Sequence, residues 1–184
     1  MSKGSRWLGI IAIAAVIVCM GACAVVGISL RYGEDILLWV EKQNALRLGS
    51  PAPDFTLPAL GASDVRLSQY RGQPVLLTFA ASWCPACREE APYQQALHAQ
   101  YPELVVVLVD SNEQESVVRG FADEFGMTFP VLLDASGTVS LRYRIFSIPT
   151  SFFIDPNGVI QYAYIGGLSP ELMAGHLPLI GVEP

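Results

Sequence analysis

The chain has 184 residues and a formal net charge of -6, and 52% of its residues are hydrophobic while only 15% are charged. This length suits one domain with a short appendage, and the apolar content excludes a disordered chain. An acidic chain offers no basic surface to a polyanion, so we expect no nucleic-acid partner.

The first predicted element is an apolar helix over residues 7–30, a stretch that carries no charged side chain. At about 1.5 Å per residue this helix is roughly 36 Å long, which is enough to cross a hydrocarbon core of about 30 Å. Lys3 and Arg6 precede it, so the positive-inside rule favours a cytoplasmic N-terminus and an exported C-terminal domain. We therefore expect residues 1–31 to form a transmembrane signal-anchor in the cell membrane.

Two other interpretations of this apolar stretch remain open. A cleaved signal peptide has a shorter apolar region and a small-residue cleavage site, which fits this longer run less well. A lipoprotein signal would place the lipid on Cys23, which follows Gly21 and Ala22. Met20 and the apolar residues beyond Cys23 fit such a signal poorly. The uncleaved anchor is therefore the favoured prediction.

Residues 32–48 form the next predicted segment, a juxtamembrane helix or linker in which Ile36 and Val40 share an apolar face. The sequence Gly49-Ser50-Pro51-Ala52-Pro53 then breaks any helix. We place the domain boundary there, so that residues 49–184 make up a separate domain.

Strands and helices alternate along the rest of the chain. The pattern predicts strands at 75–80, 104–109 and 130–133, helices at 85–100 and 113–125, a hairpin of strands 151–154 and 159–164 about an Asp-Pro-Asn-Gly turn, and a last helix capped by Ser169. Alternation followed by a hairpin predicts an α/β fold with a central sheet of mixed direction flanked by helices. Pro92 is expected to kink the helix that contains it.

Cys84 and Cys87 lie at the predicted junction of a buried strand and a helix. The N–H groups and the dipole at a helix N-terminus favour an anion, so the Cys84 thiolate should be stabilised. Cys87 lies almost one turn later on the same side and should be the more buried of the two. An exposed nucleophile and a resolving thiol are what disulfide exchange requires, so we predict a redox-active Cys84–Cys87 disulfide.

Two structural interpretations of the cysteines are less favoured. A zinc site needs four ligands, and the remaining candidates, including His98 and His176, do not stand at ligand spacing. A purely structural disulfide across one helical turn closes too short a loop to add much stability. We therefore expect no metal and no cofactor, and we interpret both histidines as ordinary surface residues.

The soluble part of the chain resembles the thioredoxin superfamily, and within it the membrane-anchored TlpA/ResA-like thiol–disulfide oxidoreductases. The opening segment is also similar to that of peroxiredoxins. Four segments carry the resemblance in the family's order: Gly49-Ser50-Pro51-Ala52-Pro53-Asp54-Phe55-Thr56-Leu57, Ala81-Ser82-Trp83-Cys84-Pro85-Ala86-Cys87-Arg88-Glu89-Glu90, Phe129-Pro130-Val131-Leu132-Leu133-Asp134, and Ile148-Pro149-Thr150-Ser151-Phe152-Phe153-Ile154-Asp155. The resemblance implies a thioredoxin-like fold for residues 49–184.

The resemblance also implies how the site binds its substrate. It implies that the Ile148–Pro149 bond is cis and faces the two cysteines. An extended substrate segment would then pair with the Ile148 backbone beside Cys84. Trp83, Pro85, Ile148 and Pro149 are thus the expected substrate-binding residues.

Glu90 stands where ResA-like proteins carry an active-site glutamate. Such a carboxylate could shuttle the proton of Cys87 and raise thiol pKa values by repulsion. The alternative is a solvated helix glutamate like Glu89. One residue departs from the thioredoxin pattern, because Thr78 stands where thioredoxins carry a buried aspartate. This departure places more weight on Glu90 or on water.

The predicted function is a membrane-anchored, extracytoplasmic thiol–disulfide oxidoreductase. Most members of the resembling family are reductants that receive electrons from a membrane transporter, often in cytochrome c maturation. Apocytochrome c and a membrane electron donor are therefore expected partners. A peroxidase is a first alternative, but that chemistry needs Thr or Ser three residues before its cysteine, where this chain has Ala81. A second alternative is a non-catalytic binding module, which the presence of both cysteines disfavours.

Overall fold

The structure is a computed structural model that describes residues 48–183. The predicted anchor over residues 1–31, with Cys23, lies outside these residues, as does the predicted linker apart from Leu48. Within the described range, no helix combines the length and the apolar character that a membrane crossing requires.

A five-stranded sheet forms the centre of the domain, with the strand order β5-β4-β3-β6-β7. The three strands on one side, β3, β4 and β5, are parallel, whereas β6 and β7 run antiparallel to their neighbours. The predicted sheet of mixed direction is therefore confirmed. The strands are β3 (Val75–Ala80), β4 (Val105–Ser111), β5 (Val131–Asp134), β6 (Thr150–Ile154) and β7 (Ile160–Ile165).

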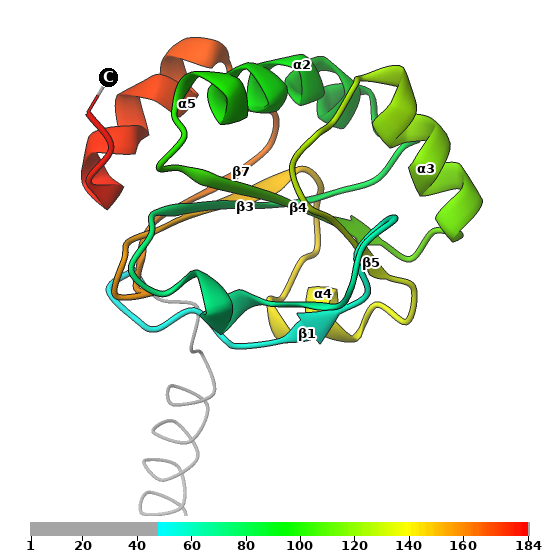
Figure 1. Ribbon diagram of the computed structural model, residues 1–184, viewed down its shortest axis with the longest axis horizontal. Helices are drawn as coiled ribbons and strands as arrows, with labels where there is room; N and C mark the ends of the chain where they lie inside the picture. The colour runs from blue at the N-terminus through cyan, green and yellow to red at the C-terminus, as the bar shows by residue number, and fades with distance from the viewer. Residues whose placement is uncertain (1–47, 184) are drawn as a thin grey trace, which may run out of the picture. The chain divides into compact units, whose positions relative to one another are not determined.

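Helices cover both faces of this sheet (Figure 1). Three of them, α2 (Pro85–Gln100), α3 (Glu115–Glu124) and α5 (Pro170–His176), lie over one face, with the turn η2 (Leu177–Ile180) after α5. The short α4 (Thr138–Arg142) lies over the other face, beside the small hairpin of β1 (Thr56–Leu57) and β2 (Val65–Arg66) and the turn η1 (Leu67–Tyr70).

The central strand β3 is buried along its whole length, because its side chains meet a separate core on each face. Leu76 and Ala80 pack in the core beneath α2, α3 and α5, whereas Leu77 and Phe79 pack in the core on the α4 side. This alternation follows from the two-residue period of a strand. It also explains why β3 and β4 read as continuous apolar runs in the sequence.

The local signals at the ends of elements hold in the structure. Ser169 caps α5, its Oγ accepting a hydrogen bond from the Leu172 N–H at 3.3 Å. The turn between β6 and β7 closes through a bond from the Gly158 N–H to the Asp155 carbonyl at 2.7 Å. Helix α2 continues through Pro92, an exposed residue.

Two features of the fold do not follow from the sequence pattern, the short helix α4 and the last two residues of β4. Helix α4 has only five residues, which is too few to display a helical period, and it begins after Gly137 in a left-handed conformation. Strand β4 continues two residues past its predicted end, through Asp110 and Ser111. Both residues are held by pairing with neighbouring strands, Asp110 opposite Ala80 and Ser111 opposite Asp134.

Candidate functional site

Cys84 is the N-cap residue of α2, placed there by the end of β3 and the loop that follows it. Its Sγ accepts a hydrogen bond from the Cys87 N–H at 3.3 Å. Pro85 occupies the first turn of the helix, where its missing N–H has no intrahelical partner to lose. The predicted position of the pair at a helix N-terminus is thus confirmed, and both cysteines are free thiols in this structure.

Both thiols are buried, which corrects the expectation of an exposed nucleophile. Cys84 is 5% exposed and Cys87 is 3% exposed, so exposure hardly distinguishes them. Burial raises the pKa of the Cys87 thiol, and the neighbouring Cys84 and Glu90 raise it further. The physical reason for the burial of Cys84 is that a second loop lies against its sulfur.

That second loop contains the Ile148–Pro149 peptide bond, which is cis as the resemblance implies. The Cys84 thiol donates a hydrogen bond to the Ile148 carbonyl at 3.7 Å, so the loop faces the cysteines. The Pro149 carbonyl accepts instead from the Gly166 N–H at the end of β7, at 2.8 Å. A substrate strand that pairs with the Ile148 carbonyl would therefore replace the Cys84 contact.

The remaining predicted substrate-binding residues lie next to Cys84 in the chain. Trp83 is 69% exposed, and Pro85 on the other side of Cys84 is exposed as well. Phe146, two residues before Ile148, is 88% exposed. Both loops therefore carry a large exposed apolar side chain close in sequence to the residue that makes the Cys84–Ile148 contact.

Glu90 is buried, which makes the alternative of a solvated helix glutamate wrong. The residue is 1% exposed, whereas the adjacent Glu89 is exposed. Its carboxylate accepts from the Leu168 N–H at 3.2 Å and from the Gln94 amide at 2.7 Å. Burial raises the pKa of Glu90, while these donors, together with the Ser151 hydroxyl, act in the opposite direction.

A buried polar network extends from Glu90 to the sheet, and most of it is not evident from the sequence. Gln94 donates to both Glu90 and Thr78, the latter at 3.1 Å. The hydroxyls of Thr78 and Ser151 are hydrogen-bonded at 2.9 Å. Thr78, which replaces the buried aspartate of thioredoxins, thus belongs to the support of Glu90. The spacing of Glu90 and Gln94, one helical turn, is the signal from which the sequence could have predicted this contact.

A second cluster of polar side chains lies at the ends of β3 and β4, and it was not predicted from the sequence. Ser82 is bonded to Glu113, the residue two before α3, and to Arg88 of α2. Asp110 is 1% exposed and neither of its carboxyl oxygens has a hydrogen-bond partner. The signal available in the sequence was an aspartate directly after an apolar run, at the edge where parallel strands end.

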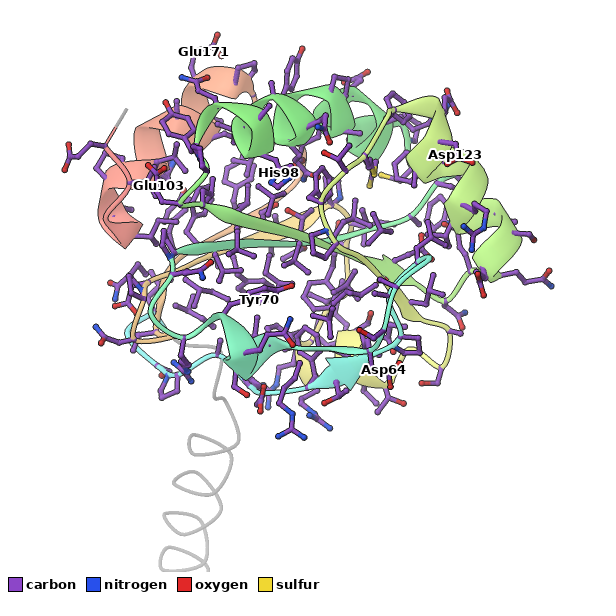
Figure 2. The ribbon with its side chains drawn as sticks, in the orientation of Figure 1. Asp64, Tyr70, His98, Glu103, Asp123 and Glu171 are labelled. Carbon is purple, nitrogen blue, oxygen red and sulfur yellow. The ribbon has the colours of Figure 1, made fainter. Side chains whose placement is uncertain are left out.

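The two histidines are half-buried, so their interpretation as ordinary surface residues is wrong. Figure 2 shows His98 between α2 and the sheet, and its ring meets the edge of Phe129 at 5.8 Å between centroids. His176 stacks on Tyr162 at 3.8 Å between centroids. Both rings fill gaps between the helices and the sheet.

The fold and the site together define a class of protein, the dithiol proteins with a thioredoxin fold. The sheet is five-stranded and mixed, two free cysteines lie at a helix N-terminus, and a cis-proline loop lies against the sulfur of Cys84. Solved structures agree with this class. One of a Chlorobium tepidum protein described as DsbE, a thiol:disulfide interchange protein, has a TM-score of 0.69 and 32% identity, over 74% of this chain and 99% of that one. The structure of StoA from Bacillus subtilis has a TM-score of 0.59 and 32% identity, and the match covers 68% of this chain and 96% of that one.

Sequence comparison narrows the class. The AhpC/TSA family matches residues 48–163. The thiol-disulfide oxidoreductase ResA of Oceanobacillus iheyensis is 41% identical over 137 residues, which cover 71% of either chain. The thioredoxin-like protein YneN of Bacillus subtilis is 36% identical over 143 residues, 76% of this chain and 84% of that protein. The chain belongs to the AhpC/TSA family, and within it to the thiol–disulfide oxidoreductases of the ResA type.

Proposed function

We propose that this oxidoreductase reduces disulfides in exported proteins, with Cys84 as the nucleophile and Cys87 as the resolving thiol. One observation carries the assignment. The Cys84 sulfur lies at the N-cap of α2, 3.3 Å from the Cys87 amide nitrogen, where a thiolate receives a hydrogen bond and the field of the helix. Cys87 lies within the helix, and burial raises the pKa of its thiol, which suits the thiol that reacts second.

The exchange balances within the two dithiols. The Cys84 thiolate attacks one sulfur of the substrate disulfide, and the bond between the substrate sulfurs breaks as the mixed disulfide forms. The Cys87 thiolate then attacks the Cys84 sulfur and releases the second substrate thiolate. Two electrons pass to the substrate, which leaves as a dithiol, and the enzyme is left with a Cys84–Cys87 disulfide.

Glu90 is the proposed acceptor of the Cys87 proton. Its carboxylate contributes to the raised pKa of Cys87, which means that the two groups interact electrostatically. Burial raises the pKa of Glu90 as well, and this brings a carboxyl group closer to the range in which it can take up and return a proton. The network of Gln94, Thr78 and Ser151 would hold the carboxylate in place during this transfer.

The direction of electron flow is part of the proposal. Burial, the neighbouring Cys84 and Glu90 raise the pKa of Cys87, so the resolving thiol stays protonated until the mixed disulfide has formed. The reductive direction is the one that the family resemblance implies. An exported reductant needs a membrane protein as its electron donor, because its compartment is oxidising. Apocytochrome c is the substrate that the family resemblance proposes.

A trapping experiment tests the assignment of the two thiols. Full-length Cys87→Ser protein, incubated with an oxidised protein substrate, should accumulate a covalent mixed disulfide through Cys84. The Cys84→Ser protein is the matched control and should accumulate none. Trapping through Cys87 in that control would reverse the roles, and failure of both variants to trap would overturn the reductase proposal.

The proposed location has its own test. We propose that residues 1–31 anchor the protein in the cell membrane with residues 49–184 outside the cytoplasm. A phosphatase reporter that requires disulfides, fused after Pro184, should be active, and the same fusion without residues 1–31 should be inactive. Equal activity of the two fusions contradicts the export proposal.

A further inference from the structure

Ser82, two residues before Cys84, has each of its polar groups bonded. Its N–H donates to Glu113 Oε2 at 2.5 Å, and its hydroxyl donates to Glu113 Oε1 at 2.7 Å. Its carbonyl accepts from Arg88 Nη1 at 3.2 Å. One residue of the active-site loop is thus held from two sides, by the segment before α3 and by α2.

Glu113 provides the stronger of these two attachments. Both of its oxygens accept a hydrogen bond from Ser82, at 2.5 and 2.7 Å, whereas Arg88 donates one bond to Ser82 at 3.2 Å. The geometry needs an acceptor at both positions, which a carboxylate supplies and an amide does not. Glu113 lies in the loop between β4 and α3, outside the segment that carries the cysteines.

The buried Asp110 lies beside Glu113 and interacts with it. Burial raises the pKa of Asp110 to about 8, and the Glu113 carboxylate contributes to the rise. At neutral pH Asp110 is therefore protonated, while the Glu113 carboxylate accepts the two Ser82 hydrogen bonds. The nearest cation on the facing helix, Arg88, is itself paired with Glu124 of α3.

We propose that Glu113 is a positioning residue for the dithiol: by holding Ser82 it keeps the Cys84 sulfur against the Cys87 N–H. The inference rests on the proposed role of Cys84 as the nucleophile. The Cys84 N–H is bonded to the Ala81 carbonyl at 3.2 Å, so residues 81–84 form a closed turn that moves with Ser82. Release of Ser82 would lengthen the bond at 3.3 Å that stabilises the Cys84 thiolate.

The sign of one measurement separates positioning from a simple charge effect. Glu113→Gln removes a negative charge near the thiols, which alone would favour the Cys84 thiolate and move its alkylation profile to lower pH. Loss of positioning acts in the opposite direction, because the thiolate loses its N–H donor. We expect alkylation of Cys84 at neutral pH to be about three- to ten-fold slower in the variant, as for a shift of half to one pH unit.

The experiment uses full-length protein with the Cys87→Ser background, in which Cys84 is the one thiol of the pair. Iodoacetamide alkylation is followed from about pH 5 to 10 by mass spectrometry of the peptide that contains Cys84. Ser82→Ala, which removes one donor and no charge, should change the profile in the same direction by about two-fold. Glu115→Gln is the control, because Glu115 is exposed and pairs with Arg119.

The outcomes are decisive in both directions. A shift to higher pH in Glu113→Gln and Ser82→Ala, with none in Glu115→Gln, supports positioning. A shift to lower pH or no shift in Glu113→Gln overturns it, as does an unchanged profile in Ser82→Ala. Trapping of substrate by the Cys87→Ser protein tests the proposed function separately, since it does not depend on the Glu113 variants.

Discussion

Glu90 and Asp110 are both buried carboxyl groups on the face of the sheet that α2, α3 and α5 cover, but their surroundings differ. Each is 1% exposed. Glu90 receives hydrogen bonds from Gln94, Ser151 and the Leu168 N–H. Asp110 has no hydrogen-bond partner on either oxygen and lies beside a second carboxylate, Glu113.

The difference teaches what each carboxyl group can do. Donors around a buried carboxylate offset the cost of burying its charge, whereas burial beside a second carboxylate favours the protonated form. Glu90 is therefore suited to the proton exchange with Cys87 that we propose. Asp110 holds its proton at neutral pH. Four experiments can break or sharpen this comparison.

The largest expected effect is stabilisation by Asp110→Asn at alkaline pH. The pKa of Asp110 is about 8 in the folded protein and 3.8 in an unfolded chain, so folding takes up a proton between these values. The stability that this proton supplies is present at low pH and is lost as the pH rises through about 8. Asparagine does not titrate, so we expect the variant to gain on the order of 3 kcal/mol at about pH 9.

Urea unfolding at about pH 4, 7 and 9 measures this gain. The gain should grow with pH and be smallest at the acidic end. An equal gain at each pH, or a loss at the alkaline end, would show that Asp110 is not the protonated member of the pair.

The substitution Glu90→Gln is expected to lower the free energy of unfolding, whereas Asp110→Asn is expected to raise it. Glutamine has one acceptor oxygen where the carboxylate has two, so either the Leu168 N–H or the Gln94 amide loses its partner. We expect a loss of about 1–2 kcal/mol in the free energy of unfolding at neutral pH. Glu89→Gln, one residue away and exposed, should change it by less than about 0.5 kcal/mol. If the Glu90 variant is as stable as this control, the network does not support a charged Glu90.

A smaller effect is expected for Thr78→Val, which keeps the shape of the side chain and removes its hydroxyl. The substitution takes an acceptor from Gln94 and a partner from Ser151, both in the buried network. We expect a loss of about 1 kcal/mol by chemical denaturation. Thr128→Val, which removes an exposed hydroxyl bonded to Gln95, is the matched control and should cost less. Equal costs at the two sites would mean that the buried network adds little.

The smallest effect concerns the titration of Cys87. Its pKa is raised first by burial and then by Cys84, with Glu90 a lesser cause. Glu90→Gln in a Cys84→Ser background should therefore lower the midpoint of Cys87 alkylation by only about half a pH unit. The same background with Glu89→Gln should leave it unchanged. A midpoint that rises in the Glu90 variant would contradict electrostatic contact between Glu90 and Cys87.

Local sequence signals predicted most of the larger elements. Apolar runs identified β3 and β4, the Asp-Pro-Asn-Gly turn identified the last hairpin, and Ser169 identified the start of α5. Each signal lies within a few residues of the feature it predicts. Helix α4 and the β1–β2 hairpin were missed because five-residue and two-residue elements are too short to show a period.

The candidate site divides in the same way. The placement of Cys84 at a helix N-terminus follows from the strand before it and from Pro85 after it, both of them local. The burial of Cys84 does not, because it depends on a loop some sixty residues later that places the Ile148 carbonyl against the sulfur. The exposed nucleophile predicted from the sequence was wrong for this reason.

The sequence by itself determined the class of fold and the position of the dithiol at the start of a helix. Both depend on periodicity, capping and spacing along the chain. Only the tertiary structure decided which carboxyl groups are buried and which receive hydrogen bonds. Glu90 and Glu89 are adjacent and identical in type, yet one is buried among donors and the other is exposed. Asp110 became part of β4 because β3 and β5 lie on either side of it. Gln94 is a local partner of Glu90, but Ser151 and the Leu168 N–H come from segments distant in sequence, and together with burial these contacts set the pKa of Glu90.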